Sequence, residues 1–260
     1  MSVLSRVAVV LCLFAGAHAQ ELKVAAASDL TAAMQKLAPA FEKQTGVHLS
    51  VSMGSSGNFF AQIQNGAPFD VFLSADKSYP EKLAQAGQAD PKTLTPYARG
   101  RLVLWTAKGS SLHFTTKDGK TLSGGLDVLA GADVHKVAIA NPEHAPYGRA
   151  AVAAMEHYKV YDQVKPKLVL GENISQTAQF AQSGNVEVGF IALSLALSES
   201  MSKSGDYVLL PDDTYPPIEQ AGVVVAASKN KELAQKFLNF LTSAEGQAIL
   251  NDLGFQGGKK

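Results

Sequence analysis

The apolar positions of this chain fall into two alternating patterns. Short continuous apolar runs alternate with longer segments in which apolar residues recur every three or four positions. The first pattern is typical of buried strands and the second of amphipathic helices. The predicted strands span 22–27, 48–53, 70–74, 101–107, 134–140, 167–170, 188–192 and 221–227. The predicted helices span 29–43, 58–65, 79–86, 148–158, 175–183, 232–241 and 244–253.

Glycines follow several predicted helices, and a proline interrupts one of them. Gly46, Gly66, Gly87 and Gly254 stand where a helix commonly ends in a left-handed residue. Pro39 lies inside the first predicted helix, lacks an N–H and crowds the carbonyl one turn earlier. We therefore expect a kink or a break at Pro39 rather than one straight helix.

The order of the elements predicts the fold class. Strands that alternate with helices indicate an α/β fold in which each sheet is mainly parallel and flanked by helices. We assign 20–100 and 217–260 to lobe I and 101–216 to lobe II, with crossings near 97–102 and 216–222. Two lobes joined by strands imply a hinge. Ligands of such sheets sit beyond the carboxyl ends of the strands, so we expect the ligand in the cleft between the lobes.

Residues 1–19 have the features of a secretory signal peptide. Arg6 supplies a positive charge, an apolar stretch follows, and Ala17-His18-Ala19 forms an A-x-A cleavage site. The apolar stretch is too short to span a bilayer. Cys12 is the one cysteine and lies inside that stretch, so the exported chain is expected to contain no disulfide and no thiolate site. The predicted location is the periplasm.

The charge balance excludes some partners. Lysine plus arginine number 23, as do aspartate plus glutamate, and the formal net charge is zero. Such a balance offers no basic footprint for nucleic acid or for anionic lipid. An anionic ligand would therefore have to be held by local dipoles.

Four turns between a strand and a helix have a composition suited to an anion. A helix N-terminus carries unpaired N–H groups and the positive end of the helix dipole. A serine there adds an O–H donor. A fully deprotonated oxyanion has only acceptors, so a site built from donors suits it without any lysine or arginine. The four turns lie at Ser28, at Ser55 and Ser56, at Tyr147 and Gly148, and at Ile174.

Several segments resemble the periplasmic molybdate-binding proteins of ABC importers. The likeness covers essentially the whole chain after the signal peptide, and the closing segment FLNFLTSAEGQAILNDLGF is similar to the wider solute-binding superfamily. The segments that carry the resemblance are 25–28 (AAAS), 54–57 (GSSG), 62–76 (QIQNGAPFDVFLSAD), 141–148 (NPEHAPYG) and 189–194 (GFIALS).

The resemblance implies a fold, a function and a site. The fold would be that of a two-lobed, type II-like periplasmic binding protein. The function would be binding of molybdate, and of tungstate, for delivery to a membrane permease and its ATPase, by a monomer without a cofactor. In the family, two hydroxyl residues of one lobe and main-chain amides of the other surround the oxyanion. These roles fall on Ser28 and Ser56, and on Tyr147 and Ile174.

Each site residue has an alternative role. Ser28 has the position of an ordinary helix N-cap. Ser55 competes with Ser56 for the contact, and the family match favours Ser56. Some relatives place a tyrosine on a later strand, at the position of Ala192, so Tyr147 could replace that phenol or could contribute only its amide.

Asp29 is the residue least suited to an anion site. A carboxylate beside a dianion repels it, so we expect the side chain to turn outward and to complement the helix dipole. In the alternative, an ionised Asp29 accepts the proton of hydrogen phosphate, and the protein is a phosphate receptor.

Two further functions are open. One is a receptor of the same architecture for sulfate or phosphate. The other is a secreted serine hydrolase, since 74–77 (SADK) fits S-x-x-K, but the companion S-D-N and K-T-G motifs are absent. The histidines show no i, i+4 spacing for a metal. We therefore predict a binding protein rather than an enzyme.

Overall fold

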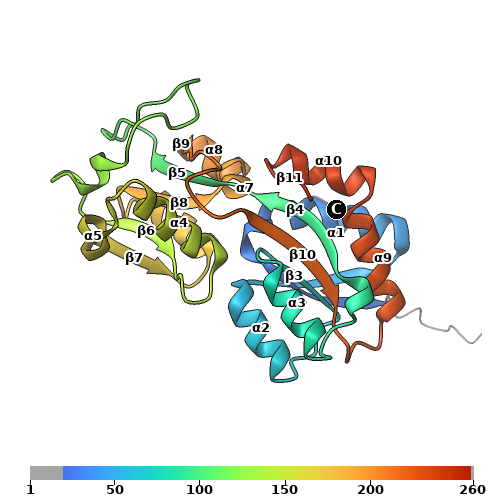
Figure 1. Cartoon of the computed structure of the whole chain (residues 1–260). Helices are drawn as coiled ribbons and strands as arrows, with labels where there is room; N and C mark the ends of the chain where they lie inside the picture. The colour runs from blue at the N-terminus through green and yellow to red at the C-terminus, as the bar shows by residue number, and fades with distance from the viewer. Residues whose placement is uncertain (1–19, 259–260) are drawn as a thin grey trace, which may run out of the picture.

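The computed structural model describes residues 20–258, which form two groups of strands and helices side by side (Figure 1). The predicted signal peptide, 1–19, lies outside the described residues. The first sheet has six strands in the order β11-β4-β10-β3-β1-β2. These strands are β1 (Glu21–Ala27), β2 (His48–Gly54), β3 (Val71–Ser74), β4 (Thr95–Gly100), β10 (Ile218–Val224) and β11 (Gln256–Gly257).

The second sheet has five strands in the order β7-β6-β8-β5-β9. They are β5 (Leu102–Ala107), β6 (Val137–Ala140), β7 (Leu168–Gly171), β8 (Val188–Ala192) and β9 (Gly205–Leu209). Trp105 lies on β5 and is buried in the core of this half, together with Phe190 of β8.

Both sheets are mixed, which corrects the prediction that each is mainly parallel. β1 runs parallel to β2 and β3, and β6 runs parallel to β7 and β8. The other pairs, β10 with β3 and β4, β11 with β4, and β5 with β8 and β9, are antiparallel. The chain enters the second sheet at β5 and returns to the first sheet at β10. Each of these strands is reached directly from the other sheet and not through the helical crossover that a parallel pair requires, and each pairs antiparallel with its neighbours.

Helices cover both faces of the first sheet. The alternation of side chains along β1 places Val24 and Ala26 in one core cluster and Ala25 in another. The first cluster is shared with α1 (Thr31–Thr45), α9 (Lys231–Leu241) and α10 (Ala244–Asp252). The second is shared with α2 (Ser56–Gln64) and α3 (Ser78–Gln85). The first sheet is therefore the middle of three layers.

Helices also pack on the second sheet, where the longer ones, α4 and α6, contact β6 and β8. Single 3-10 turns, η1 (Ser28–Leu30), η2 (Pro91–Thr93), η3 (Asp127–Ala130) and η4 (Lys165–Lys167), connect elements along the chain. The helices between β6 and β9 are α4 (Pro146–His157), α5 (Tyr161–Val164), α6 (Ile174–Gln182), α7 (Leu193–Ala196) and α8 (Glu199–Ser204).

The helix α1 continues through Pro39, so the predicted break is wrong. Leu37 and Phe41 on either side of the proline are buried against the first sheet. Pro39 and Gln35 are exposed, so water can bond to the carbonyl that the proline leaves without a donor. Packing of the buried face thus outweighs the lost hydrogen bond on the solvent face.

The chain passes between the two sheets at two places. Arg101 alone separates β4 from β5, and residues 210–217 connect β9 to β10. We propose that the lobes divide there, as 20–100 with 217–260 and as 101–216. Among residues 20–258, no helix is long and apolar enough to cross a membrane.

Candidate functional site

All four residues predicted to bind the ligand line one small cavity between the two groups of elements. Its volume is about 10 Å³, roughly the space of one water-sized sphere. None of the described residues that line it is a lysine, an arginine or a histidine. Ser28 and Ser56 come from lobe I elements, and Tyr147 and Ile174 come from lobe II elements.

Ser28 stands where β1 ends and the 3-10 turn η1 begins. Its side chain is buried and caps no helix, because α1 has Leu30 at its N-cap and no side-chain bond there. The alternative that Ser28 is only an N-cap is therefore wrong. Its Oγ accepts a hydrogen bond from the Ser175 backbone N–H at 3.4 Å. The hydroxyl proton of Ser28 remains available to a further acceptor.

The second turn separates the roles of Ser55 and Ser56. Ser55 is the N-cap of α2, and its Oγ accepts from Asn58 N–H at 3.4 Å and lies 2.9 Å from Nδ1 of His144. Ser56 is buried in the first turn of α2, and its Oγ accepts from the Ala75 N–H at 3.0 Å. Ser55 is therefore engaged in capping α2, whereas the hydroxyl proton of Ser56 is free to donate to a ligand.

Tyr147 and Ile174 both lie in the first turn of a helix. Tyr147 follows Pro146 at the start of α4, and Ile174 is the first residue of α6. First-turn amides have no carbonyl partner within their own helix. The Asn173 side chain caps α6 by accepting from the amides of Ser175 and Gln176, not from that of Ile174. Two helix N-termini with unused amides therefore face the cavity.

The side chain of Tyr147 is engaged by Asp29. Its hydroxyl donates to Oδ2 of Asp29 at 3.1 Å, and both residues are buried. Ala192 ends β8 and is buried. Since the phenol already has a carboxylate acceptor, the geometry favours the amide of Tyr147 over its hydroxyl as a donor to a ligand.

Asp29 turns inward, so the prediction that it faces outward is wrong. The side chain is completely buried and lines the cavity, and Oδ2 accepts from the Gln220 amide as well as from Tyr147. Ser194 donates to the main-chain carbonyl of Asp29 at 2.7 Å. Burial raises the pKa of Asp29 to about 7, although the hydrogen bonds from Gln220 and Tyr147 favour the ionised form. The turn η1 directs the carboxyl between the lobes, where Tyr147 and Gln220 supply donors.

Polar contacts join the two lobes around the cavity. Ser175 Oγ donates to the carbonyl of Ser28 at 2.9 Å, and Gly57 N–H donates to the carbonyl of His144 at 2.9 Å. At the rim, Arg149 of α4 pairs with Asp76 at 2.6 Å. No local pattern predicts these pairings, because each joins segments more than 70 residues apart. They hold the lobes closed over the cavity.

A family model for bacterial extracellular solute-binding proteins matches residues 22–256. The chain belongs to this family. This solute-binding protein is 38% identical over 255 residues to the molybdate-binding protein ModA of Azotobacter vinelandii, and the match covers 97% of each chain. It is 37% identical over 248 residues to ModA of Rhodobacter capsulatus, covering 95% of this chain and 93% of the relative.

A solved structure supports the same relationship. The periplasmic molybdate-binding protein of Azotobacter vinelandii superposes on this solute-binding protein with a TM-score of 0.82 at 34% identity. The match covers 92% of this chain and all of the other. It confirms the predicted α/β fold and the predicted resemblance.

The residues of the S-x-x-K match make no nucleophile–base pair. Ser74 Oγ donates to the carbonyl of Asp76 at 2.7 Å, and the Lys77 ammonium pairs with Glu219. Within residues 20–258, no group of three or more His, Cys, Asp or Glu side chains could hold a metal ion. The geometry of Ser74 and Lys77 therefore does not support the serine hydrolase.

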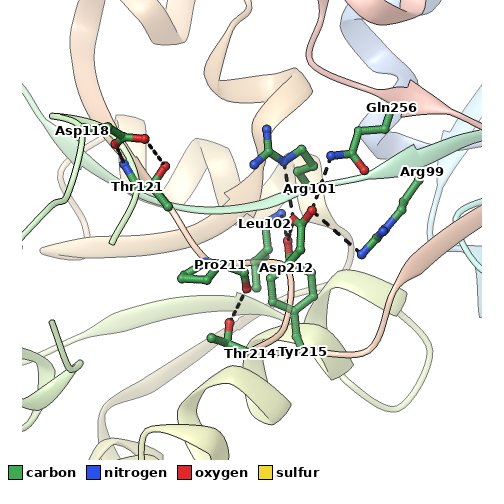
Figure 2. A network of polar contacts seen from close by, with 10 residues as sticks. All are labelled: Arg99, Arg101, Leu102, Asp118, Thr121, Pro211, Asp212, Thr214, Tyr215 and Gln256. Carbon is green, nitrogen blue, oxygen red and sulfur yellow. Dashed lines mark hydrogen bonds and ion pairs between the residues drawn. The ribbon is translucent and has the colours of Figure 1, made fainter. Parts of the chain in front are cut away.

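The crossings between the lobes carry a separate charged cluster, shown in Figure 2. Asp212, in the segment before β10, lies 3.6 Å from Nε of Arg101 and 4.0 Å from Nη2 of Arg99. Tyr215 and Gln256 donate to the same carboxylate, each at 3.4 Å. The Tyr215 hydroxyl also accepts from Leu102 N–H at 3.1 Å. This cluster, which we call the hinge cluster, connects both crossings.

Proposed function

We propose that this solute-binding protein binds molybdate between its lobes and delivers it to a membrane permease driven by an ATPase. The observation that carries the proposal is the pair of serine hydroxyls. Ser28 and Ser56 each accept a main-chain N–H, so each has its proton left to donate. The N-termini of α4 and α6 lie on the opposite side of the same cavity. The names of the two curated relatives and of the solved structure point to the same ligand.

This donor set suits a tetrahedral dianion. Molybdate offers four oxygens that accept hydrogen bonds, and the cavity offers hydroxyls and amides of Ser28, Ser56, Tyr147 and Ile174. Hydrogen bonds to a charged partner contribute about 1.5–3 kcal/mol each, so a few of them outweigh the cost of ordering the ligand. Tungstate has the same charge and shape, and we include it in the proposal.

The binding mechanism is a hinge closure. Donors come from both lobes, so only the closed form presents the full set to the anion, and the anion stabilises that form. A tetrahedral oxyanion is larger than the water-sized space of the cavity. The loaded protein would therefore hold its lobes slightly further apart than in Figure 1.

The setting follows from the predicted signal peptide and from the family. We infer that the exported protein works in the periplasm as a monomer, without a cofactor and without catalysis. Its partners would be the oxyanion and the permease with its ATPase.

A receptor for hydrogen phosphate is the second candidate, because Asp29 lines the cavity. An ionised carboxylate accepts a proton of hydrogen phosphate but repels a fully deprotonated dianion. The relatives named for molybdate favour the first candidate.

Calorimetric titration of the exported protein tests the proposal. Molybdate, tungstate, sulfate and phosphate are titrated separately at one pH and ionic strength. We expect tight binding of molybdate and tungstate with one site per chain, and binding of sulfate and phosphate that is at least about 100-fold weaker, a difference of about 2.7 kcal/mol. Tightest binding of phosphate would instead support the second candidate.

A further inference from the structure

One carboxylate oxygen in the cavity wall has no partner. Oδ2 of Asp29 accepts two hydrogen bonds, whereas Oδ1 is buried and makes none within the part of the chain that the structure describes. The N–H groups of Asp29 and Leu30 favour the ionised carboxyl, but neither makes a hydrogen bond of ordinary geometry with Oδ1. A buried, charged oxygen without a partner costs free energy. A proton on it removes the charge and supplies an O–H from which a ligand in the cavity can accept a hydrogen bond.

The hydrogen-bond donors around Asp29 determine which of its two carboxyl oxygens can carry a proton. The Tyr97 hydroxyl donates to Oε1 of Gln220 at 2.9 Å, so the Gln220 amide group must present its N–H to Asp29. Tyr147 also donates to Oδ2. Because Oδ2 already accepts from two donors, the free position for a proton is Oδ1.

Among residues 20–258, the other ionisable groups around Asp29 are tyrosines, and these stay neutral near pH 7. Burial raises the pKa of Tyr97, on β4, and of Tyr147, on α4, well above the usual range, and the Asp29 charge adds to both shifts. Burial also raises the pKa of Tyr215, before β10, to about 12. Gln220 and Ser194, from β10 and α7, are uncharged. Within residues 20–258, no lysine, arginine or histidine pairs with Asp29, so a proton is the available countercharge.

We propose that Asp29 takes up one proton from the solvent when the oxyanion enters the cavity, so that the loaded protein holds a neutral carboxyl with its proton on Oδ1. This inference rests on the proposed function. No bond of the anion is made or broken. The one proton comes from the solvent and binds the carboxylate that is ionised in the empty protein. The neutral acid no longer repels the dianion and adds one O–H to the cavity wall. In this state Asp29 donates a hydrogen bond and no longer only accepts, which suits a ligand that brings no proton of its own.

The direction of the pH effect follows from linkage. The pKa of Asp29 in the empty structure is about 7, and a dianion in the same cavity raises it further. Below pH 7 the carboxyl of the empty protein is already mostly protonated, so anion binding takes up few further protons. Above pH 7 binding takes up close to one proton, and the affinity for a fully deprotonated dianion falls by up to about tenfold per pH unit.

Titration calorimetry with molybdate at pH 6, 7, 8 and 9 tests the inference. Each pH is measured in two buffers of different ionisation enthalpy, which gives the number of protons taken up. We expect that number to rise from near zero at pH 6 to near one at pH 8. In Asp29→Asn we expect no proton uptake and a flat pH profile. The exposed Asp133→Asn serves as the matched control and should keep the profile of the unchanged protein.

The outcomes separate this inference from the proposed function. Molybdate binding without proton uptake at pH 8, or an Asp29→Asn protein that retains the uptake, would overturn the inference alone. Absence of molybdate binding at every pH would overturn the proposed function and the inference together.

Discussion

The cavity and the hinge cluster differ in how they use charge. The cavity presents hydroxyls, helix-terminal amides and one carboxyl, and no described basic side chain lines it. The hinge cluster groups Arg99 and Arg101 around Asp212 (Figure 2). Arginines are thus available in the same molecule, but they lie with a carboxylate at the crossings and not at the proposed anion site.

The difference has consequences for selectivity. A mobile basic side chain attracts any anion, whereas amides fixed at two helix ends suit a particular size and shape. Charge at the crossings has another role in our proposal, because it connects the two segments by which the chain passes between the sheets. We therefore expect substitutions in the cavity to change affinity and those in the hinge cluster to change stability.

The largest expected effect is the loss of a serine hydroxyl. Ser28→Ala and Ser56→Ala should each weaken molybdate binding by roughly 1–3 kcal/mol, because each removes a buried donor. Affinity is measured by calorimetry. Ser55→Ala is the matched control, since its hydroxyl caps α2, and its cost in affinity should be smaller. A larger loss of affinity in Ser55→Ala than in Ser56→Ala would mean that Ser55, and not Ser56, contacts the anion.

The next effect concerns the phenol of Tyr147. Tyr147→Phe keeps the backbone amide but removes a donor from Asp29. We expect molybdate affinity to change by less than about 1 kcal/mol, less than for either serine, because the backbone amide that faces the cavity survives. A loss larger than that of the serine variants would show that the hydroxyl contacts the anion directly.

A variant of the hinge cluster should separate stability from affinity. Asp212→Asn leaves Arg99 and Arg101 without their carboxylate. Since the Asp212 side chain is about one-third exposed, we expect the free energy of unfolding in urea to fall by about 0.5–1 kcal/mol. Molybdate affinity should change less than in Ser28→Ala. The comparison of the two regions would fail if Asp212→Asn reduced the affinity more.

The smallest effect is expected at the rim. Arg149→Met removes the ion pair with Asp76 that joins the lobes. The pair is partly exposed, so its loss should weaken binding by about 0.2–1 kcal/mol, mainly through faster dissociation. Stopped-flow release of molybdate measures the rate. An unchanged rate together with a strongly reduced affinity would mean that Arg149 acts on the anion itself.

Local signals in the sequence were enough for much of the fold. Apolar periodicity placed most elements, and Gly46 and Gly87 end their helices with positive φ as predicted. The strands β4 and β9 and the two-residue β11 were missed. β9 and β11 lie at sheet edges and β4 lies beside β11, and all three are short or partly polar, so they carry little periodicity. The mixed strand directions depend on how the chain crosses between the sheets, which no local pattern reports.

The site was predictable to the extent that it is built from turns. Ser28, Ser56, Tyr147 and Ile174 each follow a strand and begin a helical turn, and the structure brings all four to one cavity. The orientation of Asp29 was not predictable. It depends on Tyr147 and Gln220, which lie 118 and 191 residues away along the chain.

A crystal structure of the exported protein with molybdate tests most directly whether the site holds the anion without a basic side chain. We expect the ion between the lobes, within hydrogen-bond distance of Oγ of Ser28 and Ser56 and of the amides of Tyr147 and Ile174. No lysine or arginine should contact it. An ion bound elsewhere, or one held by a basic side chain, would contradict a site without countercharge.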